Sequence, residues 1–254
     1  MMMKKLNIGN LSISVPIVQG GMGVGISLSG LSSAVANEGG VGVISSAGLG
    51  LLYRNLSKDY IQASIMGLKE ELRKAREKTK GVIGVNVMVA MSNFADMVKT
   101  AIAEKADIIF SGAGLPLNLP SFLQKDSVTK LVPIVSSARA ARVITEKGHN
   151  LYNNLPEAFV VEGPKAGGHL GFKDEQINDE HFSLEHILPE VIDEVKDIET
   201  HYGKNIPVIV AGGIYTGEDI KRFMDMGAAG VQMGTRFVTT EECDASDIFK
   251  QTYI

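Results

Sequence analysis

Residues 207–235 read P-V-I-V-A-G-G-I-Y-T-G-E-D-I-K-R-F-M-D-M-G-A-A-G-V-Q-M-G-T, and this stretch decides the fold. Apolar runs at 207–211 and 230–233 predict two buried strands, and a glycine turn closes each run. Between them, residues 217–226 predict a helix, with Thr216 as its N-cap and acidic residues in its first turn. A strand, a helix and a second strand in this order are typical of a parallel β-α-β unit.

The same alternation runs through the rest of the chain. Apolar runs without polar alternation predict eight strands, at 15–19, 41–45, 82–87, 107–111, 131–136, 158–162, 207–211 and 230–233. Helices are expected at 28–37, 60–78, 93–104, 138–146, 184–200 and 217–226. Eight strands that alternate with helices favour an α/β fold of the (β/α)8 TIM-barrel type over an open doubly wound sheet. Because only 21 residues follow Met233, we expect the C-terminal part of the barrel to be incomplete.

Length and composition agree with one globular barrel. The chain has 254 residues, and such barrels have about 250, so we expect residues 1–254 to form a single domain. The net charge of −4 gives no reason to expect nucleic acid or an anionic membrane surface as a partner. No stretch approaches the ~18 apolar residues of a membrane helix, and the N-terminus has too short an apolar run for a signal peptide. The lone Cys243 excludes an intrachain disulfide and suits a cytoplasmic protein.

Glycine turns at three strand ends indicate a phosphate-bearing cofactor. In such barrels the catalytic residues lie on loops at the C-terminal ends of strands, and the loops after strands 7 and 8 often bind phosphate. The turns here are Gly167-Gly168 after the sixth strand, Gly212-Gly213 after the seventh and Gly234-Thr235 after the eighth. Backbone N–H groups at such turns bind phosphate without a dedicated lysine. We expect the Thr235 hydroxyl and the Arg236 charge to assist.

Residues 161–171, V-E-G-P-K-A-G-G-H-L-G, place a histidine directly behind the first glycine pair. His169 is therefore a titratable group beside whatever these glycines hold, and it is the catalytic candidate. Glu162 ends the sixth strand and serves either as a hydrogen-bond acceptor for a cofactor ring or as a structural cap of the loop. Lys165 lies either near the cofactor or in water. The polar residues 172–183 follow directly and predict a lid or a pocket wall.

The remaining histidines carry no such pattern. His149, His181, His186 and His201 lie in polar stretches or at element ends, and we expect solvent around them. Their spacing, with or without Cys243, is not that of metal ligands. The first loop, residues 19–25, matches a dinucleotide-binding G-x-G-x-x-G only loosely, because no acidic residue ends the second strand. This loop is better suited to lay its backbone and Met22 against a flat ring.

Five motifs in order resemble one known family. They are Q-G-G-M-G after the first strand, G-V-N in the third, E-G-P-K-A-G-G-H-L-G after the sixth, A-G-G-I after the seventh and Q-M-G-T-R-F after the eighth. Together they resemble the nitronate monooxygenase family, formerly called 2-nitropropane dioxygenase. That family includes the flavin-dependent enoyl-acyl-carrier-protein reductase II. The resemblance spans about residues 11–240 and is specific for an FMN-binding barrel, but less specific between members.

The resemblance implies an FMN bound without a covalent bond. It assigns the phosphate to the two later glycine turns, and it assigns the catalytic role to His169. It gives the cofactor these neighbours: Gly21, Met22, Asn86, Glu162, Gly163, Gly168, Gly212, Gly213, Gln232, Met233, Gly234 and Thr235. No metal is implied, and a homodimer is compatible with the sequence.

The motifs leave three functions open. The first is oxidation of an alkyl nitronate with O2 to a carbonyl compound and nitrite, which the long polar segment 172–183 favours. The second is reduction of an enoyl thioester with NAD(P)H. Both have a small-molecule substrate and use FMN and His169. The third is a partial barrel without catalytic activity.

Overall fold

The computed structural model describes residues 4–254, and its eight parallel strands close into a barrel in the order β10-β3-β4-β5-β6-β7-β8-β9. The strands are β3 (Ile17–Gln19), β4 (Val41–Ser45), β5 (Val82–Met88), β6 (Ile108–Gly112), β7 (Lys130–Val135), β8 (Phe159–Glu162), β9 (Val208–Ala211) and β10 (Gly230–Met233). Each expected strand is present, with its ends shifted by two residues at most. The prediction of an α/β barrel is therefore confirmed.

The chain forms two compact units. Residues 4–17, 111–121 and 130–233 make up the first unit, and residues 18–110, 122–129 and 234–254 make up the second. The first unit contains β7 to β10 with α5 (Ala138–Tyr152), α6 (Leu184–Tyr202) and α7 (Gly217–Asp225). The second contains β4 and β5 with α1 (Ser29–Asn37), α2 (Leu49–Leu52), α3 (Tyr60–Lys78) and α4 (Phe94–Ala103).

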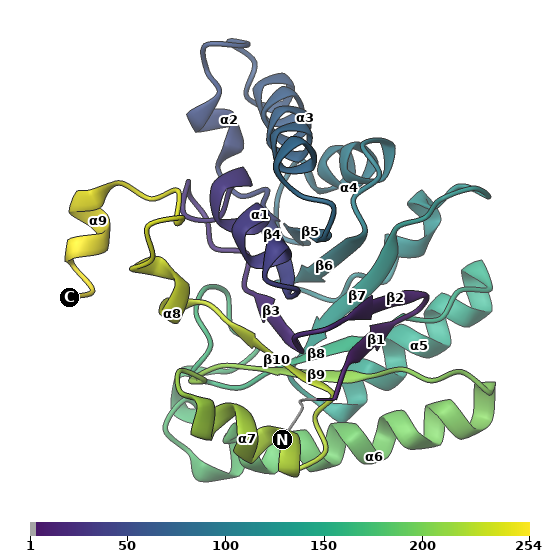
Figure 1. The fold of residues 1–254 in the computed structure, drawn as a ribbon. Coiled ribbons are helices and arrows are strands. Elements are labelled where there is room, and N and C mark those ends of the chain that lie inside the picture. The colour runs from purple at the N-terminus through teal and green to yellow at the C-terminus, as the bar shows by residue number, and fades with distance from the viewer. Residues whose placement is uncertain (1–3) are drawn as a thin grey trace. The chain divides into compact units, whose positions relative to one another are not determined.

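In the first unit, three adjacent strands are in parallel register (Figure 1). Glu162 of β8 pairs with Ala211 of β9, and Ala211 pairs with Gln232 of β10. The carboxyl ends of the three strands therefore lie side by side. The strand interiors have almost no exposed surface, because a parallel strand is covered on both faces.

The first unit also holds a hairpin that the sequence reading missed. β1 (Leu6–Ile8) and β2 (Leu11–Ile13) pair antiparallel around a turn at Gly9-Asn10. Gly9 has a φ of +56°, a conformation that two-residue hairpin turns need and glycine adopts without strain. Leu6, Ile8 and Ile13 are buried, so the hairpin contributes a further apolar face to this unit.

In the second unit, α1 packs directly on β4. A Cβ atom at Gly42 would lie 1.8 Å from the Ser32 carbonyl oxygen, so only glycine permits this approach. β4 and β5 pair in register from Val41↔Val82 to Ser45↔Asn86. The long helix α3 begins where the Asp59 carboxylate accepts a 2.8 Å hydrogen bond from the Gln62 amide.

Several helix bounds differ from the expected ones. α5 continues six residues past the expected end, to Tyr152, because Asn153 takes the left-handed conformation that ends it. Two short helices, α8 (Thr235–Val238) and α9 (Asp247–Gln251), were not expected. Thr216 is confirmed as the N-cap of α7, in a reciprocal pair with Asp219. Among residues 4–254, no helix is long and apolar enough to cross a membrane.

Candidate active site

In the first unit, the ends of β8, β9 and β10 gather several of the expected site residues. Glu162 is the last residue of β8, Gly212 and Gly213 follow β9, and Gln232 and Met233 end β10. The loops are linked through the backbone, since the Gly163 amide donates to the Ala211 carbonyl over 3.0 Å. Carboxyl ends of barrel strands are where catalytic groups lie in this fold.

The Gly212-Gly213 turn has the geometry of an anion cradle. Both residues have positive φ angles, +110° and +71°, which side chains disfavour. A Cβ at Gly212 would come within 2.9 Å of the Ala166 amide nitrogen. Within the described residues, the amides of Gly212 and Gly213 form no hydrogen bond. Two adjacent amides without partners are suited to a phosphate or carboxylate oxygen.

Glu162 stands beside this turn in an apolar setting. Its side chain is largely buried, and desolvation raises the pKa of its carboxyl from 4.5 to about 7. Within residues 4–254 its carboxylate has no hydrogen-bond partner. The structure therefore gives no support to a loop-capping role. A carboxyl with a pKa near neutrality can both hold and release a proton at physiological pH.

His169 lies on an exposed part of the loop after β8. The positions of a Cβ at Gly167 and Gly168 have no heavy atom within 4 Å, so the loop is open around the histidine. Gly168 has a φ of +86°. None of the other expected site residues that the structure describes makes a hydrogen bond with the imidazole.

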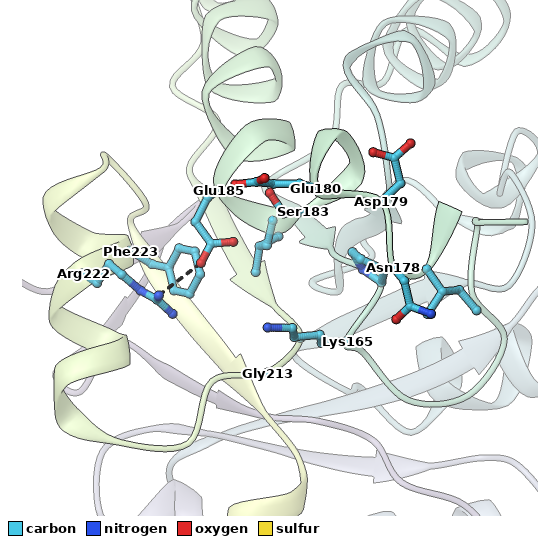
Figure 2. A pocket seen from close by; sticks show the side chains of 13 residues that line it. Lys165, Asn178, Asp179, Glu180, Ser183, Glu185, Gly213, Arg222 and Phe223 are labelled. Atoms are coloured by element: carbon cyan, nitrogen blue, oxygen red, sulfur yellow. Dashed lines mark ion pairs between the residues drawn. The ribbon is translucent and has the colours of Figure 1, made fainter. Parts of the chain in front are cut away.

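A cavity of about 300 Å³ borders the glycine turn on the side of α6 and α7 (Figure 2). Lys165 lies over Gly213, with its stem 3.1 Å from the position of a Cβ there, and its ammonium group enters the cavity. No carboxylate among the described residues pairs with this ammonium group. The opposite wall holds Arg222, which pairs with Glu185 over 3.1 Å and stacks on Phe223 at 4.7 Å.

The wall residues Arg222, Phe223 and Glu185 were missed by the sequence reading. Arg222 follows Asp219 by three residues on α7, and this spacing reads as an ordinary surface pair. Their place in a cavity depends on how α6 and α7 pack against the loops, which residue order alone does not specify.

In the second unit, the loop after β3 contacts two further expected site residues. A Cβ at Gly21 would lie 2.4 Å from the Cβ of Asn86, so the loop presses on β5 at this point. The Met22 sulfur lies 3.4 Å from the position of a Cβ at Gly234. Gly234 precedes α8, and Thr235 is the first residue of that helix. The structure therefore brings together Gly21 with Asn86 and Met22 with Gly234.

Most of the histidines that were expected to lie in solvent are exposed. His181, His186 and His201 are exposed. The expectation is wrong for His149, which is half-buried because its ring packs 4.8 Å from the ring of Tyr202. Cys243 lies in a polar stretch but is buried, with its sulfur 3.4 Å from the Ile26 carbonyl oxygen.

The closed parallel barrel, with glycine turns after β9 and β10, defines a protein of the (β/α)8-barrel class. Residues 4–254 match the model of the family described as nitronate monooxygenase, so the chain belongs to that family.

Curated relatives match nearly the whole chain at low identity. A (3aS,4S,5R,7aS)-5-hydroxy-7a-methyl-1-oxo-octahydro-1H-indene-4-carboxyl-CoA dehydrogenase of Mycobacterium tuberculosis is 30% identical over 96% of this chain and 58% of its own length. A probable nitronate monooxygenase of Staphylococcus aureus is 26% identical over 96% of this chain and 70% of its own length. The chain thus spans 58% to 70% of the length of these relatives.

Solved structures share the fold. FabK from Thermotoga maritima superposes with a TM-score of 0.73 at 29% identity, over 94% of this chain and 64% of that one. A nitroalkane oxidase from Streptomyces ansochromogenes has a TM-score of 0.72 at 22% identity, over 94% of this chain and 70% of that one, which supports the fold alone.

Proposed function

We propose that the protein binds FMN and oxidises alkyl nitronates with O2 to a carbonyl compound and nitrite. The main observation in favour of FMN is the Gly212-Gly213 turn, whose two backbone amides have no hydrogen-bond partner within the described residues. Membership of the nitronate monooxygenase family supports the same cofactor class and the reaction.

The residues of the first unit fit an FMN phosphate. Gly212 and Gly213 would donate their backbone N–H groups to it, and the positive φ angles of both residues disfavour any side chain there. Gly163, Gly168, Gln232 and Met233 are assigned to the rest of the cofactor by the sequence resemblance. The same resemblance assigns to it Gly21, Met22, Asn86, Gly234 and Thr235 of the second unit.

The chain's own contribution is proton handling beside the cofactor. Bound flavin supplies the acceptor of electrons, which no amino-acid side chain provides. His169 in its neutral form takes the acidic proton of a nitroalkane, and in its protonated form it holds the anionic nitronate. Glu162, whose carboxyl pKa is raised to about 7 by burial, would be a second group beside the glycine turn that can hold or release a proton.

A second candidate is oxidation or reduction of an acyl thioester. The Mycobacterium tuberculosis relative is named as a dehydrogenase of a carboxyl-CoA compound. The cavity beside Gly213 offers an ammonium group without a carboxylate partner, next to apolar surface from Phe223 and Leu184. The ammonium group would suit the anionic end of a substrate, although Asp179, Glu180 and Glu185 line the same cavity.

The two candidates differ in the second substrate, and this difference is the test. We expect the purified protein to be yellow, or to become so with added FMN. We expect oxygen uptake and nitrite formation with propionate 3-nitronate and no nicotinamide. Oxidation of NADH that depends on a crotonyl thioester, without nitronate turnover, would favour the second candidate. A protein that does not bind FMN would contradict both enzyme candidates and favour the noncatalytic partial barrel.

A further inference from the structure

The loop after β3 is closed by two buried polar side chains. Gln19 and Ser27 flank this loop, and both have no exposed surface. The Gln19 amide nitrogen donates to Ser27 Oγ over 2.8 Å and to the Gly20 carbonyl, and its oxygen accepts from the Val43 amide over 2.9 Å. Gln19, at the start of the loop, is therefore hydrogen-bonded both to the neighbouring strand β4 and to Ser27 at the end of the loop.

Ser27 uses its full hydrogen-bonding capacity inside the loop. Its hydroxyl oxygen accepts from Gln19 and from the Met22 amide over 3.0 Å, and it donates to the Gly20 carbonyl over 3.3 Å. The Ser27 amide in turn donates to the Met22 carbonyl over 3.0 Å. A hydroxyl has one donor and two acceptor positions, so none is left unused. The two hydrogen bonds between residues 22 and 27 fix the backbone of Met22.

A fixed Met22 backbone also holds the neighbouring Gly21 and the Met22 side chain in place. Gly21 is pressed against Asn86, and the Met22 side chain lies against Gly234. The tip of the loop is different, since Gly23 and Val24 are exposed and take no part in the network. The network thus orders the part of the loop that carries the expected site residues, rather than the loop as a whole.

We infer that Gln19 and Ser27 are positioning residues that hold the Gly21-Met22 backbone ready for the cofactor. This inference rests on the proposed function. A loop that is ordered before binding loses less conformational entropy when a ligand arrives, so it binds the ligand more tightly. A fully satisfied buried polar network specifies one conformation, which an apolar filling of the same space would not do.

Ser27→Ala tests the inference, with Ser64→Ala as its matched control. Ser64 is equally buried, but its hydroxyl donates over 2.8 Å to the Tyr60 carbonyl within its own helix α3. Three quantities are measured on the full chain: thermal stability without FMN, hydrogen exchange of the Met22 amide without FMN, and the FMN dissociation constant.

We expect Ser27→Ala to speed Met22 amide exchange and to weaken FMN binding by about tenfold. Its melting temperature should lie below that of Ser64→Ala, because the Ser27 hydroxyl makes three hydrogen bonds and the Ser64 hydroxyl makes one. Ser64→Ala should leave both the exchange and the dissociation constant unchanged. Ser27→Cys, which keeps the side-chain volume with a weaker hydrogen-bonding group, should fall between Ser27→Ala and the wild type. It also serves if Ser27→Ala does not fold.

Two results would overturn the inference alone. They are unchanged Met22 exchange in both Ser27 variants, or faster exchange with an unchanged FMN dissociation constant. A wild-type protein that binds no FMN would instead overturn the proposed function, and the inference with it.

Discussion

The Asp244 carboxylate accepts a 2.8 Å hydrogen bond from the Leu28 amide, 216 residues earlier in the chain. It also accepts from the amides of Gly30 and Leu31, at 2.9 and 3.1 Å. The remaining amide of this turn, that of Ser29, donates over 2.6 Å to the buried carboxylate of Glu71. The N-terminus of α1 has no side-chain cap of its own, so two distant carboxylates satisfy its free amides.

Asp244→Ala should therefore destabilise the second unit. Loss of a capping carboxylate costs about 1–2 kcal/mol of the free energy of unfolding, and three amides lose their acceptor here. Asp244→Asn keeps one acceptor oxygen and should cost less. Urea denaturation measures both. Equal stability of Asp244→Ala and the wild type would show that water replaces the carboxylate without loss.

Gly213→Ala should weaken FMN binding, and Gly203→Ala provides the control. The two glycines share a left-handed backbone, with φ of +71° and +67°, so each substitution should cost about 1 kcal/mol of stability. Gly203 ends α6 and has no atom within 4 Å of a Cβ position, whereas Gly213 belongs to the cradle beside Lys165. Titration with FMN separates the variants. Equal dissociation constants would contradict the placement of the phosphate.

The strands could be predicted because burial on both faces leaves a direct mark on the sequence. A strand such as V-I-V-A at β9 must be apolar throughout, and glycine must follow where the chain turns tightly. The hairpin of β1 and β2 also has a local sequence signal, because its Gly9-Asn10 turn lies between alternating apolar residues. The sequence analysis did not predict this hairpin. Local patterns therefore account for most of the fold.

Only those parts of the site that belong to a local sequence pattern could be predicted. The glycine turns and His169 stand in sequence next to strand ends. The cap of α1 by Asp244, the bond from Gln19 to Val43 and the ion pair of Arg222 with Glu185 join distant segments. Tertiary packing determines which residues meet in these three interactions, so the spacing of residues in the sequence does not predict them. The raised pKa of Glu162 likewise follows from the burial around it.

Glu162→Gln should remove a pH dependence of stability. The folded protein raises the pKa of this carboxyl from 4.5 to about 7, so it binds the proton more tightly than the unfolded chain does. The free energy of unfolding should therefore fall as pH rises from about 4.5 to 7, by at most about 3 kcal/mol. The glutamine variant should lack this fall and be the more stable protein at pH 8.

Denaturation of the two proteins at pH 5 and pH 8 measures this effect. Parallel behaviour of Glu162→Gln and the wild type across this range would show that the carboxyl reaches water in solution. A reaction that needs the protonated carboxyl should also slow in the wild type above pH 7.

His169→Ala should keep FMN and lose most turnover. The imidazole is exposed and contacts none of the cradle residues through a hydrogen bond in the described structure, so neither folding nor phosphate binding should depend on it. If it moves the proton of the substrate, its loss should lower kcat by about 100-fold or more, which is typical of a general base.

His186→Ala is the control, because His186 is an exposed histidine at the start of α6 whose ring is hydrogen-bonded only to Ser183. Steady-state rates with 3-nitropropionate, the nitroalkane form that still carries the acidic proton, set against the FMN content of each variant, decide the matter. Equal rates in His169→Ala and His186→Ala would remove His169 from the mechanism and leave Glu162 as the titratable group beside the cradle.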